Sequence, residues 1–323
     1  MNITVIGGGL AGVFAAKTLI EKGETVTIIE KSRSIGGRMA TRRIGEGRAD
    51  HGAQFFTVRS VELEKLTEEW FEKKWIKRWF GDDYPRYSGM EGMNSFIKKI
   101  AQNLPVTLQE RVDHIEAKDT ELILSTNTGK KYTSDAVVLT APVPQALELL
   151  EKSPIHLTNQ DKNSLAASKF KPCFVGLLTL KKPVSIGENG IISDHVPAGV
   201  DKIVANDQKG ISHSPILSVY MNGDWSRDHF ALKDDEVLNE IVAILSPDLI
   251  ESNNLSAYQL KRWRYAEATH VYREPFLKLE NYPIFIAGDS FLTKNDTSGR
   301  TRIESAILSG IRVGEATFRD SRY

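Results

Sequence analysis

The feature that most constrains this chain is the glycine-rich segment GGGLAG at residues 7–12. The short apolar run 3–6 before it indicates a buried strand, and residues 13–22 after it form a helix window that ends at Gly23. A turn of this kind between a strand and a helix begins a βαβ unit, whose helix N-terminus offers free amides to a phosphate. The segment therefore predicts a Rossmann-type nucleotide-binding unit.

The glycine spacing and the acid that follows it specify the nucleotide further. Gly7, Gly9 and Gly12 have the GxGxxG spacing, which suits a tight turn, close approach to a pyrophosphate and close packing of helix on strand. The next apolar run ends at Glu30, about 20 residues on, where an adenosine ribose needs an acceptor. We therefore favour nucleotide binding over an ordinary βαβ turn. Because a carboxylate repels a 2′-phosphate, we expect FAD or NAD.

A second glycine-rich element, IGGRMATRR at residues 35–43, follows almost at once. A simple NAD dehydrogenase would continue from Glu30 into another helix and strand. Here paired glycines let the backbone approach a ligand, and Arg38 supplies a planar fork for a phosphate or a flavin edge. Arg42 and Arg43 better fit a solvated basic loop. The element favours FAD over NAD.

The composition excludes several classes of function. Lys plus Arg and Asp plus Glu both total 42 and the pI is near 7.1, so no global field favours nucleic acid or an anionic membrane. No apolar stretch is long enough to span a bilayer and no leader is evident, which predicts a cytoplasmic protein. Cys173 is the only cysteine, and His51 and His114 are isolated, so we expect no disulfide and no catalytic metal. We interpret His51 as a structural histidine.

One segment, WFEKKWIKRWF at residues 70–80, mixes aromatic and basic residues. Such a mixture also occurs on surfaces that bind nucleic acid or membranes. Trp75 and Trp79 are four residues apart, which places them on one face of a helix or a strand. Because the net charge gives polyanion binding no support, we favour a satellite core with solvated lysines.

Motifs along nearly the whole chain resemble those of the FAD-binding amine oxidase group and, within it, the renalase-like branch. The N-terminal motifs are common to many flavoproteins, whereas the GAQFF, GM, APxPQA and RWxYA blocks together point more specifically to renalase-like proteins. The matching segments cover nearly the whole chain: GGGLAG, IEKS, GGRMATRR, ADHGAQFF at 49–56, YSGMEGMNSF at 87–96, VVLTAPVPQALELL at 137–150, KRWRYAEA at 261–268, IFIAGDSF at 284–291 and RIESAILSG at 302–310.

The resemblance implies an α/β fold. It consists of a Rossmann-type FAD-binding domain of the GR2, p-hydroxybenzoate hydroxylase-like kind and an inserted α+β substrate domain built on an antiparallel sheet. The β-rich runs KPCFVGLLTL, PILSVYMN and LSAYQLKRWRY should form that sheet, with one helix near 234–245. The expected bounds are 1–60, 91–150 and 281–323 for the FAD-binding domain and 61–90 and 151–280 for the substrate domain.

The resemblance also assigns the contacts of a non-covalently bound FAD. For the adenosine and pyrophosphate it implies Gly7, Gly9, Ala11, Gly12, Glu30, Arg38 and Val112, and further cofactor-binding positions are Lys31, Gly37 and Met39. For the ribityl chain and isoalloxazine it implies Ala53, Gln54, Asp289, Arg302 and Ile303. A helix beginning at Ile303 would stabilise negative charge on the reduced flavin through its dipole and free amides. The loop before it, residues 291–301, is longer than is usual in the family.

Three residues are candidates for the catalytic site: Gln54, Trp263 and Tyr265. Trp263 and Tyr265 are two apart in a strand-like run and so share one face. They form either ordinary sheet packing or a wall of the substrate cavity that faces the flavin. The RWxYA resemblance favours the second interpretation.

The resemblance implies oxidation of misreduced dihydronicotinamides, the 2- or 6-dihydro isomers of NAD(P), by hydride transfer to flavin N5, with O2 giving H2O2. An anionic dinucleotide needs local cations, and the candidates are Lys169, Lys171, Arg262 and Arg264, unless these are plain surface charge. One alternative is a flavin amine oxidase acting on small amines or polyamines, with Asp82, Asp83, Asp224 and Trp225 as possible cage residues. Another is a flavin-binding protein without efficient turnover. The sequence leaves open the phosphorylated form of the donor, the natural acceptor and the oligomeric state.

Overall fold

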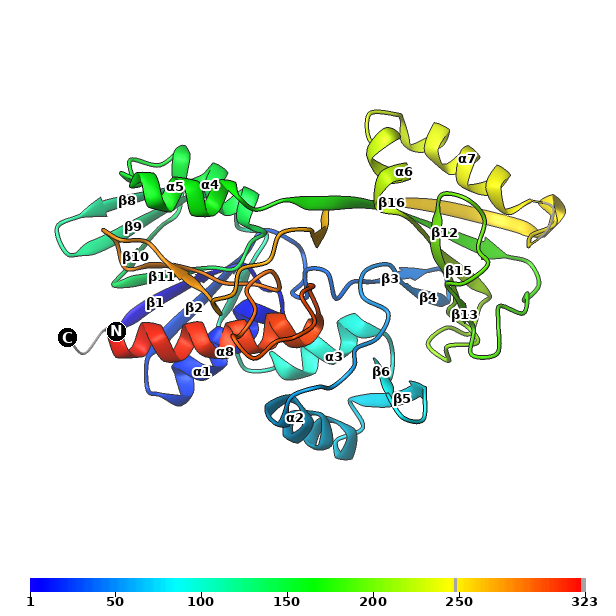
Figure 1. Ribbon diagram of the computed structural model, residues 1–323, viewed down its shortest axis with the longest axis horizontal. Helices are drawn as coiled ribbons and strands as arrows, with labels where there is room; N and C mark the ends of the chain where they lie inside the picture. The colour runs from blue at the N-terminus through cyan, green and yellow to red at the C-terminus, as the bar shows by residue number, and fades with distance from the viewer. Residues whose placement is uncertain (247–248, 321–323) are drawn as a thin grey trace. The chain divides into compact units, whose positions relative to one another are not determined.

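The computed structural model describes residues 1–246 and 249–320. The chain forms two compact units, each assembled from separate segments (Figure 1). The first unit consists of Met1–Gly37, Ile97–Lys169 and Ala268–Tyr323, and the second of Arg38–Phe96 and Phe170–Glu267. Helix α3 (Met93–Ile100) contains the point in the sequence where the second unit gives way to the first.

A mostly parallel sheet forms the centre of the first unit. Among the described residues it has six strands in the order β17-β18-β11-β1-β2-β7. All neighbours pair in parallel except β17 and β18, which are antiparallel. The strands are β1 (Asn2–Ile6), β2 (Thr25–Glu30), β7 (Val106–Leu108), β11 (Ala136–Leu139), β17 (Leu277–Lys278) and β18 (Ile284–Ile286).

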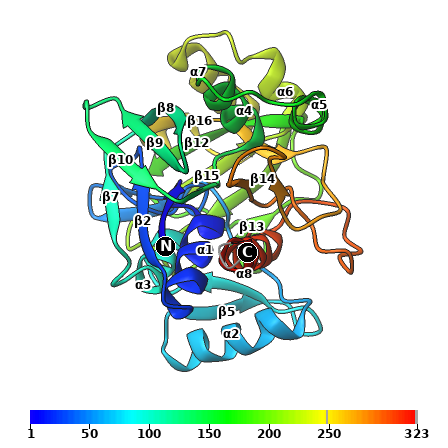
Figure 2. The ribbon, with the colours of Figure 1, turned by 90° about the vertical axis from the view of Figure 1, so that its left-hand side faces the viewer.

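Helices α1 (Leu10–Glu21) and α8 (Ile303–Asp320) cover one face of this sheet side by side (Figure 2). They approach closely because two glycines of α8 face α1. A Cβ on Gly310 would overlap Ala11, and one on Gly314 would lie 2.9 Å from Thr18. The helix that follows the glycine turn is thereby fixed against both the sheet and the C-terminal helix.

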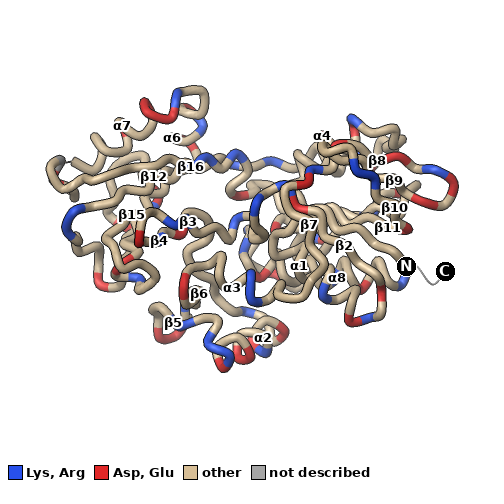
Figure 3. Tube along the Cα trace, turned by 180° about the vertical axis from the view of Figure 1, so that it is seen from behind, with Lys and Arg blue, Asp and Glu red and all other residues tan. Residues whose placement is uncertain are grey.

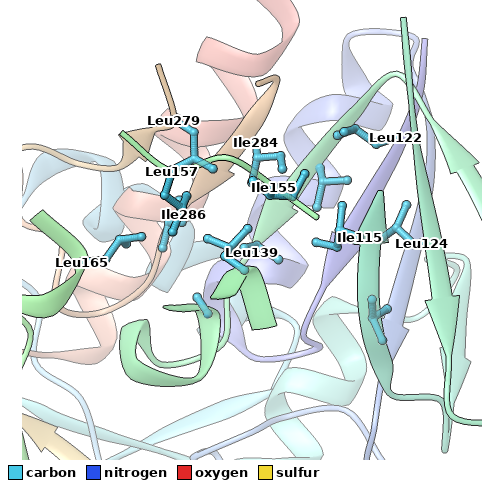
Figure 4. Close-up of a cluster of buried hydrophobic side chains, with 14 of the residues drawn as sticks. Ile115, Leu122, Leu124, Leu139, Ile155, Leu157, Leu165, Leu279, Ile284 and Ile286 are labelled. Carbon is cyan, nitrogen blue, oxygen red and sulfur yellow. The ribbon is translucent and has the colours of Figure 1, made fainter. Parts of the chain in front are cut away.

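The opposite face of the sheet packs against a second apolar cluster, which Figure 4 shows around Leu139, Ile284 and Ile286. Further side chains of the cluster come from helices α4 (Val143–Glu151) and α5 (Asn159–Ala166) and from a three-stranded sheet. The strands of that sheet are β8 (Val112–Lys118), β9 (Glu121–Thr126) and β10 (Lys131–Ser134). A sheet covered on both faces explains why its strands β11 and β18 consist of apolar residues alone.

The second unit is built on a sheet whose order, in the part of the chain described, is β13-β14-β15-β12-β16. The β13–β14, β14–β15 and β12–β15 pairs are antiparallel. Helices α6 (Gly223–Asp228) and α7 (Asp234–Leu245) share one apolar cluster with this sheet, and η1 (Ser252–Asn254) precedes β16. The strands are β12 (Phe170–Leu180), β13 (Ile191–Ile192), β14 (Val200–Ala205), β15 (Ile216–Met221) and β16 (Leu255–Ala268).

The other face of this sheet packs against a hairpin formed by β3 (Thr41–Ile44) and β4 (Gly47–Asp50). Helix α2 (Val61–Glu72) and the paired strands β5 (Ile76–Phe80) and β6 (Arg86–Gly89) complete the second unit. The expected fold class, a Rossmann-type α/β domain with an inserted antiparallel-sheet domain, is confirmed. The expected helix near 234–245 is α7.

The observed units differ from the expected domain bounds in four segments: 38–60, 91–96, 151–169 and 268–280. Residues 38–60, expected with the nucleotide-binding part, lie in the second unit because the β3–β4 hairpin packs on its sheet. Residues 151–169 and 268–280 lie in the first unit instead. There Leu157, Leu165 and Leu279 are buried in the α4–α5 cluster.

The basic and aromatic segment 70–80 is divided between the end of α2 and β5. Trp79 packs against Phe55, and its indole N–H donates to the Asn189 carbonyl at 2.9 Å. The expectation of solvated lysines is wrong for Lys77, because its ammonium donates to the carbonyls of Lys209 and Gly210 at 2.8 and 2.9 Å. The segment therefore covers the loop that contains Lys209.

Charges of both signs are interspersed along the chain (Figure 3). In the described ranges, no helix is both long enough and apolar enough to cross a membrane.

Candidate functional site

The glycine turn between β1 and α1 has the geometry of a phosphate cradle. Gly7 has φ +112°, and a Cβ on it would lie 2.7 Å from Thr140 Oγ1. A Cβ on Gly12 would overlap the carbonyl oxygen of Gly7, so both positions require glycine. At Gly9, by contrast, a Cβ would meet no described protein atom within 4 Å. Gly9 also precedes α1 and has no side chain to cap it, so the first amides of α1 receive no side-chain cap.

Glu30 lies beside this turn with its carboxylate fixed in place. Its side chain is buried at the end of β2, and its two oxygens accept the amides of Gly8 and Ser32, each at 2.7 Å. An ionised carboxylate has about four lone-pair positions, so it retains acceptor capacity for a ribose hydroxyl. The Glu110 amide donates to the Glu30 carbonyl, and Val112 follows two residues later at the start of β8. The predicted adenine strand therefore begins near Glu30, whereas Lys31 is exposed and bonds Gln145.

The second glycine element lies against the first. The Gly36 amide donates to the Gly8 carbonyl at 2.8 Å, and Gly37, at φ +52°, would place a Cβ 3.4 Å from the Gly9 Cα. These contacts explain why paired glycines occur at 36 and 37. Both are needed because the backbone there has positive φ and approaches the glycine turn at Gly8 and Gly9.

The segment from Arg38 onward belongs to the second unit. The Arg38 guanidinium donates to the Ala266 carbonyl at 3.1 Å, and the Ala53 amide donates to the Arg38 carbonyl at 2.9 Å. A Cβ on Gly52 would overlap that same carbonyl. Met39 is buried. Arg38 and Ala53, both predicted to contact FAD, are therefore neighbours through the backbone.

In the first unit, three further predicted residues gather at the start of α8. Ser305 Oγ donates to the Asp289 carbonyl at 2.8 Å, and Ile303 is the first residue of the helix. Arg302 pairs with Asp296 of the long loop at 2.7 Å and lies 3.5 Å from Glu304. Its Nε and Nη1 are buried and have no hydrogen-bond partner among the described residues. Unpaired buried donors of a guanidinium are costly, so this position is suited to an acceptor from a ligand.

Gln54, a predicted catalytic residue, is buried with its side-chain amide fully engaged. Its Oε1 accepts from Lys209 at 2.7 Å, and its Nε2 donates to the Asp50 carbonyl at 2.8 Å and to the Tyr220 hydroxyl. Both amide hydrogens are thus used inside the second unit. Within that unit, the side chain of Gln54 acts as a structural link.

A buried ion pair anchors this network. Lys209 and Asp50 are fully buried, and Lys209 Nζ lies 2.7 Å from Asp50 Oδ2 while also donating to the Gln54 carbonyl at 2.6 Å. Asp50 Oδ1 accepts the Met93 amide at 3.0 Å and the Thr41 hydroxyl. Burial lowers the pKa of Lys209, and the Asp50 carboxylate opposes that shift. With all three ammonium hydrogens bonded, the pair is satisfied rather than available to a ligand.

No sequence motif marks this network. Lys209 looks like an ordinary loop lysine, and Ser218 and Tyr220 are separate polar residues on the apolar strand β15. Their spacing of two along the strand, which places both on one face, was the available signal.

Trp263 and Tyr265 share a face of β16, as predicted. The Trp263 indole N–H donates to the His51 carbonyl at 2.7 Å, and the indole stacks on the His51 imidazole with the ring centroids 5.6 Å apart. Tyr265 meets Phe170 edge to face at 5.6 Å. Both side chains are partly exposed, so they offer aromatic surface beside His51.

His51 is held neutral. Burial first, and the Lys261 ammonium second, lower the pKa of His51 to about 4; Asp50 opposes this and Arg42 adds to it. Its Nδ1 is buried without a partner among the described residues. A neutral imidazole of this kind is not a general base poised near neutral pH, but it can accept or donate one hydrogen bond.

We expect His51 to make stability depend on acidity. The unfolded chain binds a proton near the usual pKa of 6.5 and the folded protein near about 4, so stability should fall as pH falls through this interval. Across the whole interval, the free energy of unfolding should fall by about 3 kcal/mol through this residue. His51→Gln should flatten the slope of the free energy of unfolding between these two pH values, measured by urea titration. An unchanged slope would contradict the assignment.

The predicted substrate cations do not lie together with Trp263. Arg262 pairs with Asp234 at 2.6 Å and covers the Phe174 ring, and Arg264 lies over Phe230, so both face the α6–α7 cluster. Lys169 and Lys171 are exposed.

The polyamine cage residues are equally dispersed. Asp82 pairs with Arg78 and Asp224 with Arg227 in exposed ion pairs, Asp83 is exposed, and Trp225 stacks on His229. In the described chain, no group of three or more His, Cys, Asp or Glu is arranged to hold a metal. Burial raises the pKa of the Cys173 thiol to about 12, which makes it unreactive.

Comparison with known proteins places these features in a family context. Residues 66–316 match the family described as flavin containing amine oxidoreductase, and residues 5–70 match the NAD(P)-binding Rossmann-like domain. Mouse (Mus musculus) renalase is 31% identical over 171 residues, which are 46% of this chain and 49% of renalase. This confirms the resemblance noted from the motifs.

Two other relatives match shorter stretches. The flavin-dependent L-tryptophan oxidase RebO of Lentzea aerocolonigenes is 35% identical over 25% of this chain and 19% of its own. Putrescine oxidase of Kocuria rosea is 32% identical over 21% of this chain and 14% of its own. The matches thus span about half the length of renalase and less of the other two.

One solved structure, of an Exiguobacterium protein described as a protoporphyrinogen oxidase, superposes with a TM-score of 0.73 over 99% of both chains. Its sequence identity is 13%, so this likeness concerns the fold alone.

Proposed function

Because this chain belongs to the flavin containing amine oxidoreductase family, we propose that it is a renalase-like FAD-dependent oxidase that acts on misreduced dihydronicotinamide dinucleotides. The family makes it a flavin oxidoreductase, and FAD and the donor are the finer parts of the proposal. The observation that supports this donor is the match to renalase over 171 residues. The proposed substrates are the 2- or 6-dihydro isomers of NAD(P).

The residues of the first unit fit the nucleotide half of a non-covalently bound FAD. We assign the pyrophosphate to the open space above Gly9 and to the free amides at Ala11 and Gly12, and the adenosine ribose to Glu30. The buried, unpartnered donors of Arg302, next to the amides at the start of α8, suit an electron-rich acceptor such as a flavin carbonyl. Val112 and Asp289 take the adenine and ribityl contacts that the resemblance implies.

The resemblance alone assigns the remaining contacts, which are those of Lys31, Gly37, Arg38, Met39, Ala53 and Gln54. When bound, FAD would supply the redox chemistry, that is, acceptance of a hydride from the donor and return of the two electrons to O2, which with a proton from solvent gives H2O2. Arg38 is proposed to bind phosphate through its planar fork, and the backbone at Ala53 and Gln54 to lie along the flavin. Because Lys209 and Asp50 hold this backbone, it is pre-organised before the cofactor binds.

We expect Arg38→Ala to weaken FAD binding. Removing a charge-assisted hydrogen bond costs about 1.5–3 kcal/mol, so the dissociation constant should rise about 10- to 100-fold. Equilibrium titration of the deflavinated protein with FAD measures it. Arg43→Ala, a neighbouring exposed arginine, is the matched control and should leave the affinity unchanged. Equal affinities in all three proteins would remove Arg38 from the site.

The aromatic face formed by Trp263, Tyr265 and His51 is proposed to orient the donor. A dihydronicotinamide releases its hydride through the push of the ring nitrogen and has no proton to lose. A neutral His51 and two aromatic rings therefore suffice to position it and exclude water. No acid–base pair is required for this reaction.

Product analysis tests the proposed reaction. Protein loaded with FAD is incubated in air with borohydride-generated NADH isomers, with authentic NADH and with a polyamine panel. We expect NAD+ and H2O2 in equal amounts from the isomers alone. Formation of an aldehyde and ammonia from an amine, without NAD+ from any isomer, would favour the amine oxidase alternative. The match to putrescine oxidase supports that alternative.

A further inference from the structure

Strand β16 and the β3–β4 hairpin direct two cations toward the same side of the second unit's sheet. Side chains alternate along a strand, so Lys261 shares the face of Trp263 and Tyr265 and not that of Arg262. On β3, Arg42 lies two residues from Ile44, which packs in one cluster with Trp263. Arg42 therefore projects from the hairpin face that packs against this sheet.

These two cations are not neutralised. In the described ranges, no carboxylate lies within 4 Å of the Arg42 guanidinium or the Lys261 ammonium. Burial first and Arg42 second lower the pKa of Lys261, and the acid that opposes them, Asp234, is engaged by Arg262 at 2.6 Å. Two like charges near one another disfavour the folded state unless an anion joins them.

His51 adds a third group to this face. Its ring stacks on Trp263, and its buried Nδ1 has no hydrogen-bond partner in the described chain. Buried ring nitrogens normally find a partner, so a missing one indicates a position that a ligand or water fills. Positive charge, an unpartnered nitrogen and an aromatic surface thus occur together within one unit.

We propose that Arg42, Lys261 and His51 form a binding site for an anionic group of the substrate, a phosphoryl or carboxylate group, with Trp263 packing against the portion next to it. The two cations supply charge, and His51 donates one hydrogen bond from Nδ1. This inference rests on the proposed function: for a dihydronicotinamide dinucleotide, the anionic group is the diphosphate. The same site repels a polyamine, because it presents two cations and no carboxylate.

The test measures binding to protein already loaded with FAD, so that an ADP-containing probe cannot enter the cofactor site. ADP-ribose, inorganic pyrophosphate and L-tryptophan are the probes, and calorimetry gives each dissociation constant. We expect Arg42→Gln and Lys261→Gln each to weaken ADP-ribose binding about 10- to 100-fold, the effect of losing a charge-assisted hydrogen bond. Binding should also depend less on salt in each variant.

Two variants serve as matched controls. Arg43→Gln removes the neighbouring charge on β3, and Arg264→Gln removes a charge from the opposite face of β16, over Phe230. Both should bind ADP-ribose as the wild type does. In turnover, the two site variants should raise KM for the donor with little change in kcat, because the site is proposed to bind the group remote from the reacting carbon.

The probes distinguish the sources of the anion. ADP-ribose binding that depends on Arg42 and Lys261 supports a dinucleotide, and L-tryptophan binding that depends on them supports an amino-acid carboxylate. Wild-type affinity for every probe in both site variants would overturn the site. If ADP-ribose binding depends on both cations but no dihydronicotinamide is oxidised, the site stands and the proposed reaction fails.

Discussion

Replacing Lys209 by methionine is expected to lower the free energy of unfolding by about 3–5 kcal/mol, because it leaves the Asp50 carboxylate charged and unpaired in the protein interior. The same change removes the bonds to the carbonyl and the side chain of Gln54. Urea unfolding followed by tryptophan fluorescence is the measurement. The fluorescence of Trp79 is sensitive to this site, because the Lys209 ammonium lies 4.8 Å from the Trp79 ring centroid.

Two comparisons isolate the buried pair. Lys202→Met breaks the surface pair with Asp201 and should cost no more than about 1 kcal/mol. Lys209→Met combined with Asp50→Asn removes both charges and should recover part of the loss. A loss below about 1 kcal/mol for Lys209→Met alone would show that the pair does not hold the 50–54 segment.

The second large effect is expected from Gly9→Ala. The added methyl group meets no atom of the described residues within 4 Å, so the variant should fold, but it enters the space that we assign to the pyrophosphate. We expect FAD affinity to fall by at least about 100-fold. Gly12→Ala should instead impair folding itself, because its methyl group overlaps the Gly7 carbonyl.

The thermal midpoint of the FAD-free protein separates these effects. It should be the same for Gly9→Ala as for the wild type, and lower for Gly12→Ala. Unaltered FAD affinity in a folded Gly9→Ala protein would place the pyrophosphate elsewhere.

Local sequence rules predicted the first unit well. The glycine turn, its flanking strand and helix and the position of Glu30 all follow from contacts between residues close in sequence. The paired glycines at 36 and 37 were expected near a ligand, and their positive φ and their approach to the Gly8 and Gly9 backbone give the physical reason.

In the second unit, contacts between residues far apart in the sequence limited what could be predicted. The hairpin at 41–50 joins the second unit because Ala49 and Ile44 pack against strands more than a hundred residues later. Gln54 was predicted to face the flavin, yet its amide is engaged by Lys209, which no motif connects to it. Alternation along β16 is visible in the sequence, but which face the helices cover is not. Arg262 and Arg264 were predicted as substrate cations, whereas they lie over Phe174 and Phe230 on the face that α6 and α7 cover.

The most direct test of the account is anaerobic stopped-flow absorbance of the FAD-loaded protein, mixed separately with NADH isomers, authentic NADH and polyamines. We predict rapid loss of the visible flavin absorbance with the dihydronicotinamide isomers and none with polyamines. Reduction by polyamines alone, or by no donor, would contradict the proposed function.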